Sequence, residues 1–298
     1  MLLPRPTPRQ IHTLAWEVKA WGAYNVGMPF PYFLRLAYIG TDFHGWQIQT
    51  HHRSVQADLW KAMRAIDPAA PMPQGTGRTD AGVHAKAQGV VIRMTRAWEP
   101  YRLLAAINAH LAADARVMQA LPVHEDFWPR HHALAKRYVY RIHQGSAEDP
   151  FERHHRWYVH GARQLDTQAM AAASHALLGE HDFTSFRHQE CAAKTPIRKL
   201  FHIGIVEQEA QLDLVFEGNR FLMHQVRIMA GTLVDVGKGR LPADGLGGIL
   251  AARNRSRAGL TAPSHGLCLE EVWYESRWGI GGPCPWGDRG PSPEIGAH

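Results

Sequence analysis

Hydrophobic and polar positions follow two periods along the chain, and each period predicts its own kind of element. Apolar residues two positions apart predict strands at 32–39, 88–94, 116–123, 137–143, 200–206, 212–216 and 267–274. Apolar residues three and four positions apart predict helices at 55–66, 101–111, 165–178, 222–236 and 243–252. Helices and strands mix throughout the chain, which predicts an α/β (α+β) fold.

The predicted elements form two halves of similar make-up, at 31–145 and 146–276, although no fixed-period repeat relates them. Residues 1–30 are predicted to be an N-terminal extension, because prolines open it and glycines with a proline close it. Residues 277–298 are rich in Gly and Pro and are predicted to form a flexible tail.

The composition is that of a globular, moderately basic protein. Of the 298 residues, 45% are hydrophobic and 20% charged, and the net charge is +6. This balance fits a polyanionic partner such as nucleic acid, although an ordinary basic enzyme has it too. The three scattered cysteines predict no disulfide framework and suit a reducing, cytoplasmic compartment. No apolar run reaches transmembrane length and no signal peptide opens the chain, so we expect no membrane association.

Several kinds of chemistry find no motif in this sequence. There is no phosphate-binding Walker loop, no dinucleotide fingerprint and no nucleophile elbow. Three tandem histidine pairs, at 51–52, 131–132 and 154–155, lack the four-residue spacing of a metal-binding helix. We therefore interpret them as basic surface and predict no metal site.

The run from Gly75 to Ala85 is the strongest candidate for a functional site. Its three glycines mark a loop, between a helix and a strand, whose backbone takes unusual conformations or approaches a ligand closely. Within it lie one cation, Arg78, and one anion, Asp80. A carboxylate on a tight, braced turn can be aimed at a substrate and can act as a nucleophile or base without a cofactor. The alternative is that Asp80 only caps its own turn.

Aromatic and basic residues elsewhere are compatible with RNA binding, but each has an ordinary structural explanation. Trp46 follows a glycine in a loop, where it can stack on a base or act as a buried anchor. On the predicted strand at 137–143, Tyr138 shares one face with apolar residues, whereas Arg137 lies on the other. That strand suits RNA, or is an ordinary strand with one solvated face.

The sequence resembles the TruA family of tRNA pseudouridine synthases in six ordered stretches between residues 32 and 274. They are Gly77–His84, Phe43–Gln49 with Ser54–Gln56, Arg137–Tyr140, Asp182–Phe186, Phe221–Arg227 with Gly231–Leu233, and Ala262–Leu267. The chain departs from the family pattern at Ile39 and Gln225, which bears on substrate range more than on chemistry.

This resemblance implies that uridine in RNA is isomerised to pseudouridine, with Asp80 as the catalytic nucleophile attacking either the sugar or the base. Arg78 is expected to hold the flipped nucleotide, Tyr138 to stack on the base and take part in proton movement, and Arg227 to pair with Asp80. Since the base must leave its stack, further substrate contacts are expected. These are Trp46, His84, Arg137 and Leu267.

The resemblance also implies a pseudouridine synthase fold, in which two similar mixed halves share a central antiparallel sheet and an active-site cleft lies between them. The expected substrate is the anticodon stem-loop of tRNA at positions 38–40, bound by a homodimer without a metal or organic cofactor. Three alternatives stay open at this point: another RNA target, a non-catalytic RNA-binding protein, and a hydrolase acting on a small acidic substrate.

Overall fold

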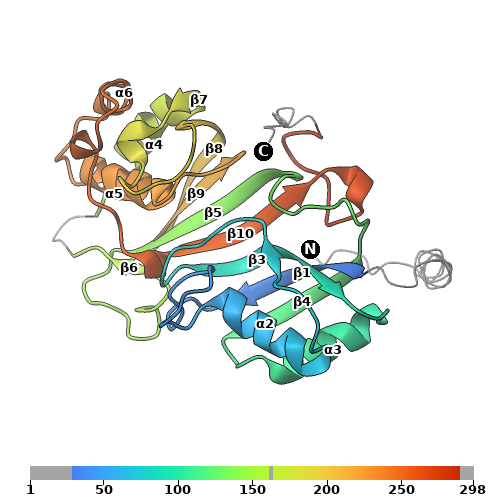
Figure 1. Cartoon of the computed structure of the whole chain (residues 1–298). Helices are drawn as coiled ribbons and strands as arrows, with labels where there is room; N and C mark the ends of the chain where they lie inside the picture. The colour runs from blue at the N-terminus through green and yellow to red at the C-terminus, as the bar shows by residue number, and fades with distance from the viewer. Residues whose placement is uncertain (1–28, 161–163, 289–298) are drawn as a thin grey trace.

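The computed structural model describes residues 29–160 and 164–288 (Figure 1). The predicted N-terminal extension therefore lies almost entirely outside the described residues. Within them, strands build one large sheet and helices gather in two separate groups at its two ends (Figure 1). This arrangement agrees with the predicted mixed fold.

Ten strands of the described residues form the sheet. They are β1 (Phe30–Tyr38), β2 (Gln74–Gly75), β3 (His84–Met94), β4 (Ala115–Pro122), β5 (Ala133–His143), β6 (Trp157–Tyr158), β7 (Gly179–Asp182), β8 (Ile197–Gln208), β9 (Gln211–Gly218) and β10 (Leu267–Tyr274). Their order is β4-β1-β3-β10-β5-β9-β8-β7, with β2 beside β3 and β6 beside β5. Because β10 runs parallel to β3 and β6 parallel to β5, the predicted antiparallel sheet is in fact mixed.

Five α-helices of the described residues flank this sheet. They are α2 (Val55–Ile66), α3 (Pro100–His110), α4 (Thr167–Ser174), α5 (Gln225–Gly237) and α6 (Gly245–Ala251). Helices α2 and α3 lie near β1, β3 and β4, whereas α4, α5 and α6 gather at the end formed by β5, β9 and β8 (Figure 1). Helix α2 has the predicted bounds, because Ser54 caps its N-terminus and its apolar residues face the core.

The last strand, β10, joins the two ends of the molecule. It comes from the second half of the chain, yet it lies between β3 and β5, with Leu269 paired to Tyr138. Strand β5 in turn pairs with β9 from Lys136 to His143. A division of the chain at residue 145 therefore cuts across a continuous sheet, and the core runs through both halves.

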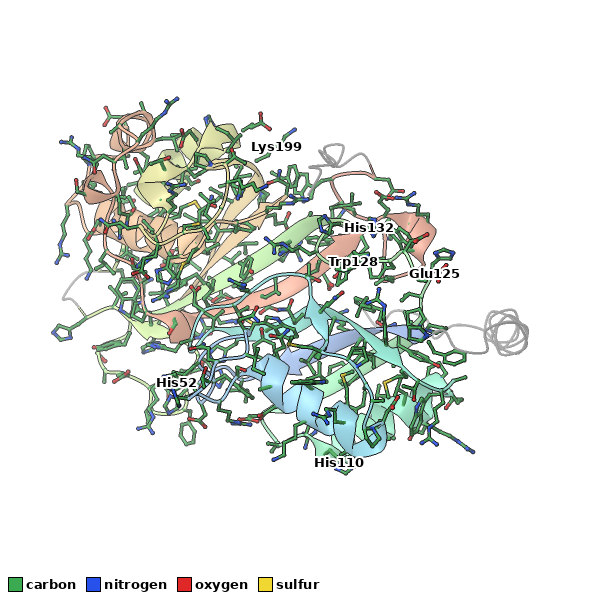
Figure 2. All side chains as sticks on the ribbon, in the orientation of Figure 1. His52, His110, Glu125, Trp128, His132 and Lys199 are labelled. Atoms are coloured by element: carbon green, nitrogen blue, oxygen red, sulfur yellow. The ribbon has the colours of Figure 1, made fainter. Side chains whose placement is uncertain are left out.

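The first part of the predicted flexible tail packs against the sheet. Cys284 is buried, and the ring of Trp286 stacks on Phe201 of β8 with 5.6 Å between ring centroids. His132, labelled in Figure 2, lies on the segment leading into β5. The ring of Trp278 packs against it with 4.5 Å between ring centroids. Part of residues 277–288 therefore has apolar contacts with the sheet, because aromatic and sulfur side chains lie among the Gly and Pro residues. The flexibility of the tail stays a prediction.

Candidate active site

The loop that carries Asp80 is fixed on both sides of the carboxylate. The backbone N–H of Trp46 donates to the carbonyl of Thr79 at 3.1 Å, and the Thr79 hydroxyl shares a 2.8 Å hydrogen bond with that of Tyr38. Two residues after Asp80, Gly82 has φ +77°, a conformation that glycine adopts without strain. The Asp80 side chain is 23% exposed, so it is held by its loop and still reachable.

The first turn of helix α5 brings a cation to this carboxylate. Nη1 of Arg227 donates to Oδ2 of Asp80 at 3.3 Å, while its Nε donates to the carbonyl of Ala262 at 2.8 Å. These two bonds fix the plane of the guanidinium. Asp80 lies on the loop before β3 and Arg227 lies on α5, so the site forms where this loop meets the first turn of α5. The predicted pairing of Arg227 with Asp80 is confirmed.

A second side chain, that of His224 just before α5, also contacts Asp80, and the sequence assigned it no role. Its Nε2 lies 3.5 Å from Oδ2 of Asp80, and its ring packs edge-on against His188 with centroids 4.5 Å apart. Its backbone has φ +60°, which is uncommon for a residue other than glycine. The signal in the sequence was its position three residues before Arg227, within the same motif.

The protonation of His224 follows from its surroundings. Burial lowers its pKa, and the positive charge of Arg227 and the ring of His188 lower it further, against the opposing effect of Asp80. The neutral imidazole therefore prevails near neutral pH. Its Nδ1 is buried without a hydrogen-bond partner, so Nε2 is the ring atom that faces the carboxylate.

Tyr138 of strand β5 lies near enough to Asp80 for the two groups to interact electrostatically. Burial raises the pKa of its phenol, and the negative charge of Asp80 raises it further, which places the two groups in the same electrostatic environment. Its ring packs edge-on against Phe221 at 5.1 Å. The hydroxyl thus stays protonated at neutral pH and is able to donate a hydrogen bond.

Arg78 is exposed two residues before Asp80. Its Nε donates to the side-chain carbonyl of Gln47 at 3.1 Å, and within the described residues it has no carboxylate partner. Its charge is therefore free to meet an anionic substrate at the rim of the site.

Two expected substrate contacts are instead part of the core. Trp46 is 2% exposed, and its indole occupies the space that a Cβ on Gly75 would fill. The interpretation as a buried anchor is thus correct and the one as a stacking platform is wrong, because neither ring face is open to a base. His84 is also buried, which lowers its pKa to about 4.

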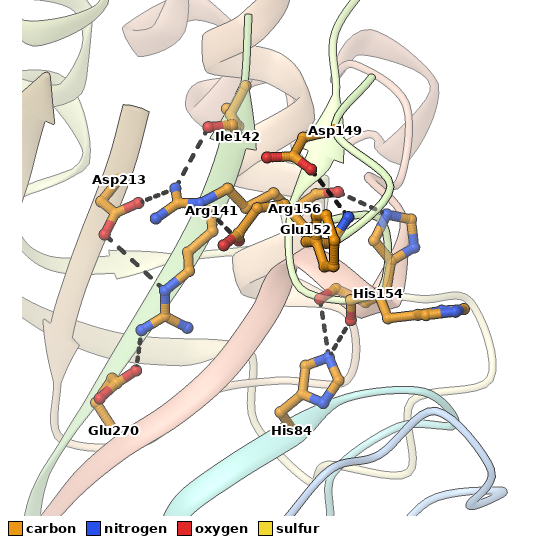
Figure 3. Close-up of polar contacts among 11 residues, drawn as sticks. His84, Arg141, Ile142, Asp149, Glu152, His154, Arg156, Asp213 and Glu270 are labelled. Atoms are coloured by element: carbon orange, nitrogen blue, oxygen red, sulfur yellow. Dashed lines mark hydrogen bonds and ion pairs between the residues drawn. The ribbon is translucent and has the colours of Figure 1, made fainter. Parts of the chain in front are cut away.

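The hydrogen bonds of His84 explain why it is buried. Its Nδ1 accepts from the backbone N–H of Gly40 at 2.9 Å, and its Nε2 lies 2.8 and 2.9 Å from the carbonyls of His154 and His265 (Figure 3). A neutral imidazole with a proton on Nε2 satisfies all three contacts. His84 therefore joins three loops with both ring nitrogens in contact with the backbone, and its contact with substrate stays a prediction.

Arg137 and Leu267 lie on opposite faces of the sheet. Arg137 forms an ion pair with Glu217 and lies over the ring of Trp273, on the face of β5 opposite to Tyr138. It does not belong to the Asp80 site. Leu267 is on the same face as Tyr138 but is buried in the core, so its contact with substrate stays a prediction.

The face of the sheet opposite to Tyr138 is neutralised by ion pairs. There Arg141 pairs with Glu270, and Arg156 pairs with Asp213 at 2.7 Å (Figure 3). The cations on this face of β5 are thus occupied by carboxylates. A cavity of about 300 Å³ on this face, lined in part by Cys268 and Arg141, does not include Asp80 and is not part of the site.

Two further expectations concern metals and membranes. In residues 29–160 and 164–288, no group of three or more His, Cys, Asp or Glu side chains is arranged to hold a metal ion. Over the same residues, the helices are all too short or too polar to cross a bilayer.

Comparison with known proteins supplies the family. Residues 173–275 match a family model described as tRNA pseudouridine synthase. A protein of Myxococcus xanthus named tRNA pseudouridine synthase A is 40% identical over 242 residues, which cover 81% of this chain and 91% of the relative. A protein of the same name from Rhodopseudomonas palustris (strain BisA53) is 42% identical over 245 residues, covering 82% and 99%. One from Bradyrhizobium diazoefficiens is 41% identical over 244 residues, with the same coverage.

Proposed function

Since this chain belongs to the tRNA pseudouridine synthase A family and isomerises uridine to pseudouridine in tRNA, we propose that Asp80 is the nucleophile and that the target lies in the anticodon stem-loop, at positions 38–40. The observation that carries the assignment of Asp80 is its contact with Arg227 and His224 on a loop braced by backbone hydrogen bonds. The target positions rest on the resemblance to the family.

The proposed reaction needs a carboxylate, a proton path and a dry site. Asp80 attacks C1′ of the ribose or C6 of the uracil, and the glycosidic N1–C1′ bond breaks. The detached uracil turns so that C5 bonds to C1′, and the bond to Asp80 breaks, which frees the carboxylate. The proton on C5 then leaves, and N1 takes up a proton in its place. The product has the same atoms as the substrate, which fits a site built from side chains alone.

Each neighbouring residue has a role that its position supports. Arg227, fixed by Ala262, holds the Asp80 carboxylate in one orientation. Tyr138 offers a protonated hydroxyl and a flat ring to the flipped base. Arg78, exposed at the rim, binds the phosphate or the opened helix next to that base.

We also propose that the chain acts in the cytoplasm as a homodimer, with tRNA lying across both subunits. The dimer rests on the resemblance to bacterial members of the family. The free cysteines of the described residues, at 191, 268 and 284, suit a reducing compartment. Molar mass measured by light scattering during size-exclusion chromatography distinguishes a monomer of 33.5 kDa from a dimer.

Tritium release from tRNA labelled at uridine C5 tests the catalytic assignment, with the label moved among positions of the anticodon arm. We expect release by the wild type at positions 38–40 and a fall of at least about a thousandfold for Asp80→Asn, because no other group replaces a lost nucleophile. Glu180→Gln is the matched control, since it removes an exposed carboxylate on β7 at the far edge of the sheet.

The outcomes separate the parts of the proposal. Turnover by Asp80→Asn at the wild-type rate would overturn the role of Asp80. Release only from labels outside the anticodon arm would move the target and leave the chemistry in place.

A further inference from the structure

Lys136 is a cation on the substrate side of the sheet that the reaction described above does not use. It precedes Tyr138 by two residues on β5, so both side chains leave the strand on the same face. Its Nζ donates to the carbonyl of Thr76 at 3.3 Å. A Cβ on Gly77 would lie 2.6 Å from this nitrogen, so the ammonium occupies the space that glycine leaves. Lys136 thus contacts the loop that carries Asp80.

Arginine charges act on Lys136. Burial, together with the charges of Arg130 and Arg220, lowers the pKa of Lys136 to about 8. Burial and then the charge of Arg220 lower the pKa of a third arginine, Arg198. The Nε of Arg198 is buried without a hydrogen-bond partner. Lys136, Arg130, Arg198 and Arg220 are called the basic cluster below.

The cations of the basic cluster differ from those on the opposite face of strand β5. On the opposite face, Arg137 pairs with Glu217 and Arg141 pairs with Glu270. Throughout the described parts of the chain, by contrast, no member of the basic cluster has an ion pair with a carboxylate. One face of the same strand is therefore neutralised by the protein, and the other is left positive.

An unbalanced group of this kind has an energetic cost. Like charges repel, and a partly buried ammonium loses hydration without gaining a carboxylate. An anion from outside the protein removes this cost, and its negative charge has to be spread over oxygens that several donors reach together. A phosphodiester phosphate meets these requirements, and contacts with phosphates make a large contribution to nucleic-acid affinity.

From this geometry we propose that the basic cluster is a phosphate-binding subsite, in which Lys136 holds a backbone phosphate of the RNA beside the nucleotide presented to Asp80. The inference rests on the proposed function, because it takes Asp80 as the position of the target nucleotide. Two residues along a strand span roughly 7 Å, so Lys136 and Tyr138 are separated by about the size of one nucleotide. Lys136 is accordingly a positioning residue and not a catalytic one.

A scan of neutral phosphates tests this subsite. The probe is an RNA stem-loop that the wild type converts in the tritium assay, with one phosphate at a time replaced by methylphosphonate. Binding is measured for Lys136→Met and for its parent, both carrying Asp80→Asn so that the RNA is not consumed. We expect one position flanking the target at which the replacement weakens binding of the parent roughly tenfold, as for a lost charged hydrogen bond. At that position the same replacement should change binding of Lys136→Met less than twofold.

Matched variants distinguish the subsite from a general loss of charge. Lys61→Met removes an exposed lysine on helix α2. In this variant, each methylphosphonate replacement should weaken binding as much as it does in the parent. Gly77→Ala keeps Lys136 but displaces its ammonium, so it should resemble Lys136→Met at the same phosphate. In Lys136→Arg, replacement of that phosphate by methylphosphonate should again weaken binding, though less than in the parent. The salt dependence of binding should fall by about one ion for Lys136→Met.

Two results would overturn the inference. One is a Lys136→Met variant, folded as judged by its circular dichroism, that shows the parent's penalty at every phosphate. The other is a Gly77→Ala variant with unaltered binding at the position assigned to Lys136. Either failure leaves the tritium assay untouched, so it is distinguishable from a failure of the proposed function.

Discussion

At the scale of single residues, the sequence located the carboxylate and its arginine but missed what surrounds them. Asp80 and Arg227 stood out through their motifs, and the structure places them 3.3 Å apart. His224 was unassigned because its left-handed backbone and its proximity to Asp80 are properties of the folded chain. The burial of Trp46 was equally unreadable, since a loop tryptophan is as compatible with stacking as with anchoring.

His224 is expected to position Asp80, and side-chain replacements test this. His224→Ala should lower kcat by roughly tenfold to a hundredfold with little change in KM, because the carboxylate gains freedom to leave its productive orientation. His224→Gln should recover most of the rate, since its amide reaches the place of Nε2. His224→Asn is the control, because asparagine tolerates the left-handed backbone but is too short to reach Asp80. Single-turnover tritium release measures the rates, and equal rates for Ala and Gln would contradict the assignment.

At the scale of elements, the amphipathic pattern was most reliable where packing alone decides the structure. Helix α2 and strand β10 have the predicted bounds, because each has its own apolar face. Strands β8 and β9 extend beyond their apolar stretches, since backbone pairing continues into polar residues. Helix α5 begins at Gln225 instead of Leu222, because His224 adopts the left-handed conformation just before the first helical turn.

His84 links three loops through the contacts of its neutral imidazole, and this predicts that the stability of the fold depends on pH. The pKa of His84 is about 4 in the folded chain and about 6.5 in an unfolded one, so between these values the unfolded state binds more protons. Stability therefore falls as pH decreases from 6.5 to 4, by up to about 3 kcal/mol from this group. His84→Asn keeps the acceptor for Gly40 but does not titrate.

Urea unfolding at several pH values measures the effect of His84. The variant should be less stable than the wild type at pH 7, and the difference between them should narrow as pH falls to 4. The comparison cancels the other histidines, including His265, whose pKa is also lowered by burial. A difference that is constant across this range would contradict the prediction.

At the scale of the whole molecule, the two faces of the sheet differ in charge and in function. The face with Tyr138, Lys136 and Leu269 contains the reaction site and unbalanced positive charge. The opposite face is closed by ion pairs and by the C-terminal segment. The sequence predicted the two halves but not this division, because the parallel pairing of β10 with β3 joins residues far apart in the chain.

Trp286 tests whether the two faces are independent. Its Nε1 donates to Glu217 at 2.9 Å and its ring stacks on Phe201, so the C-terminal segment is fixed to the face opposite to Tyr138. Trp286→Ala should lower the free energy of unfolding by about 1–3 kcal/mol through the lost stacking and hydrogen bond, with kcat and KM unchanged at temperatures where the variant is folded. Trp286→Phe keeps an aromatic ring and loses only the N–H, so its free energy of unfolding should lie between those of the wild type and Trp286→Ala.

Thermal unfolding measures the stability of these variants, and parallel tritium-release assays measure their kcat and KM. A loss of activity in a fully folded Trp286→Ala variant would show that the two faces are coupled, and an unchanged melting temperature would show that the segment does not dock.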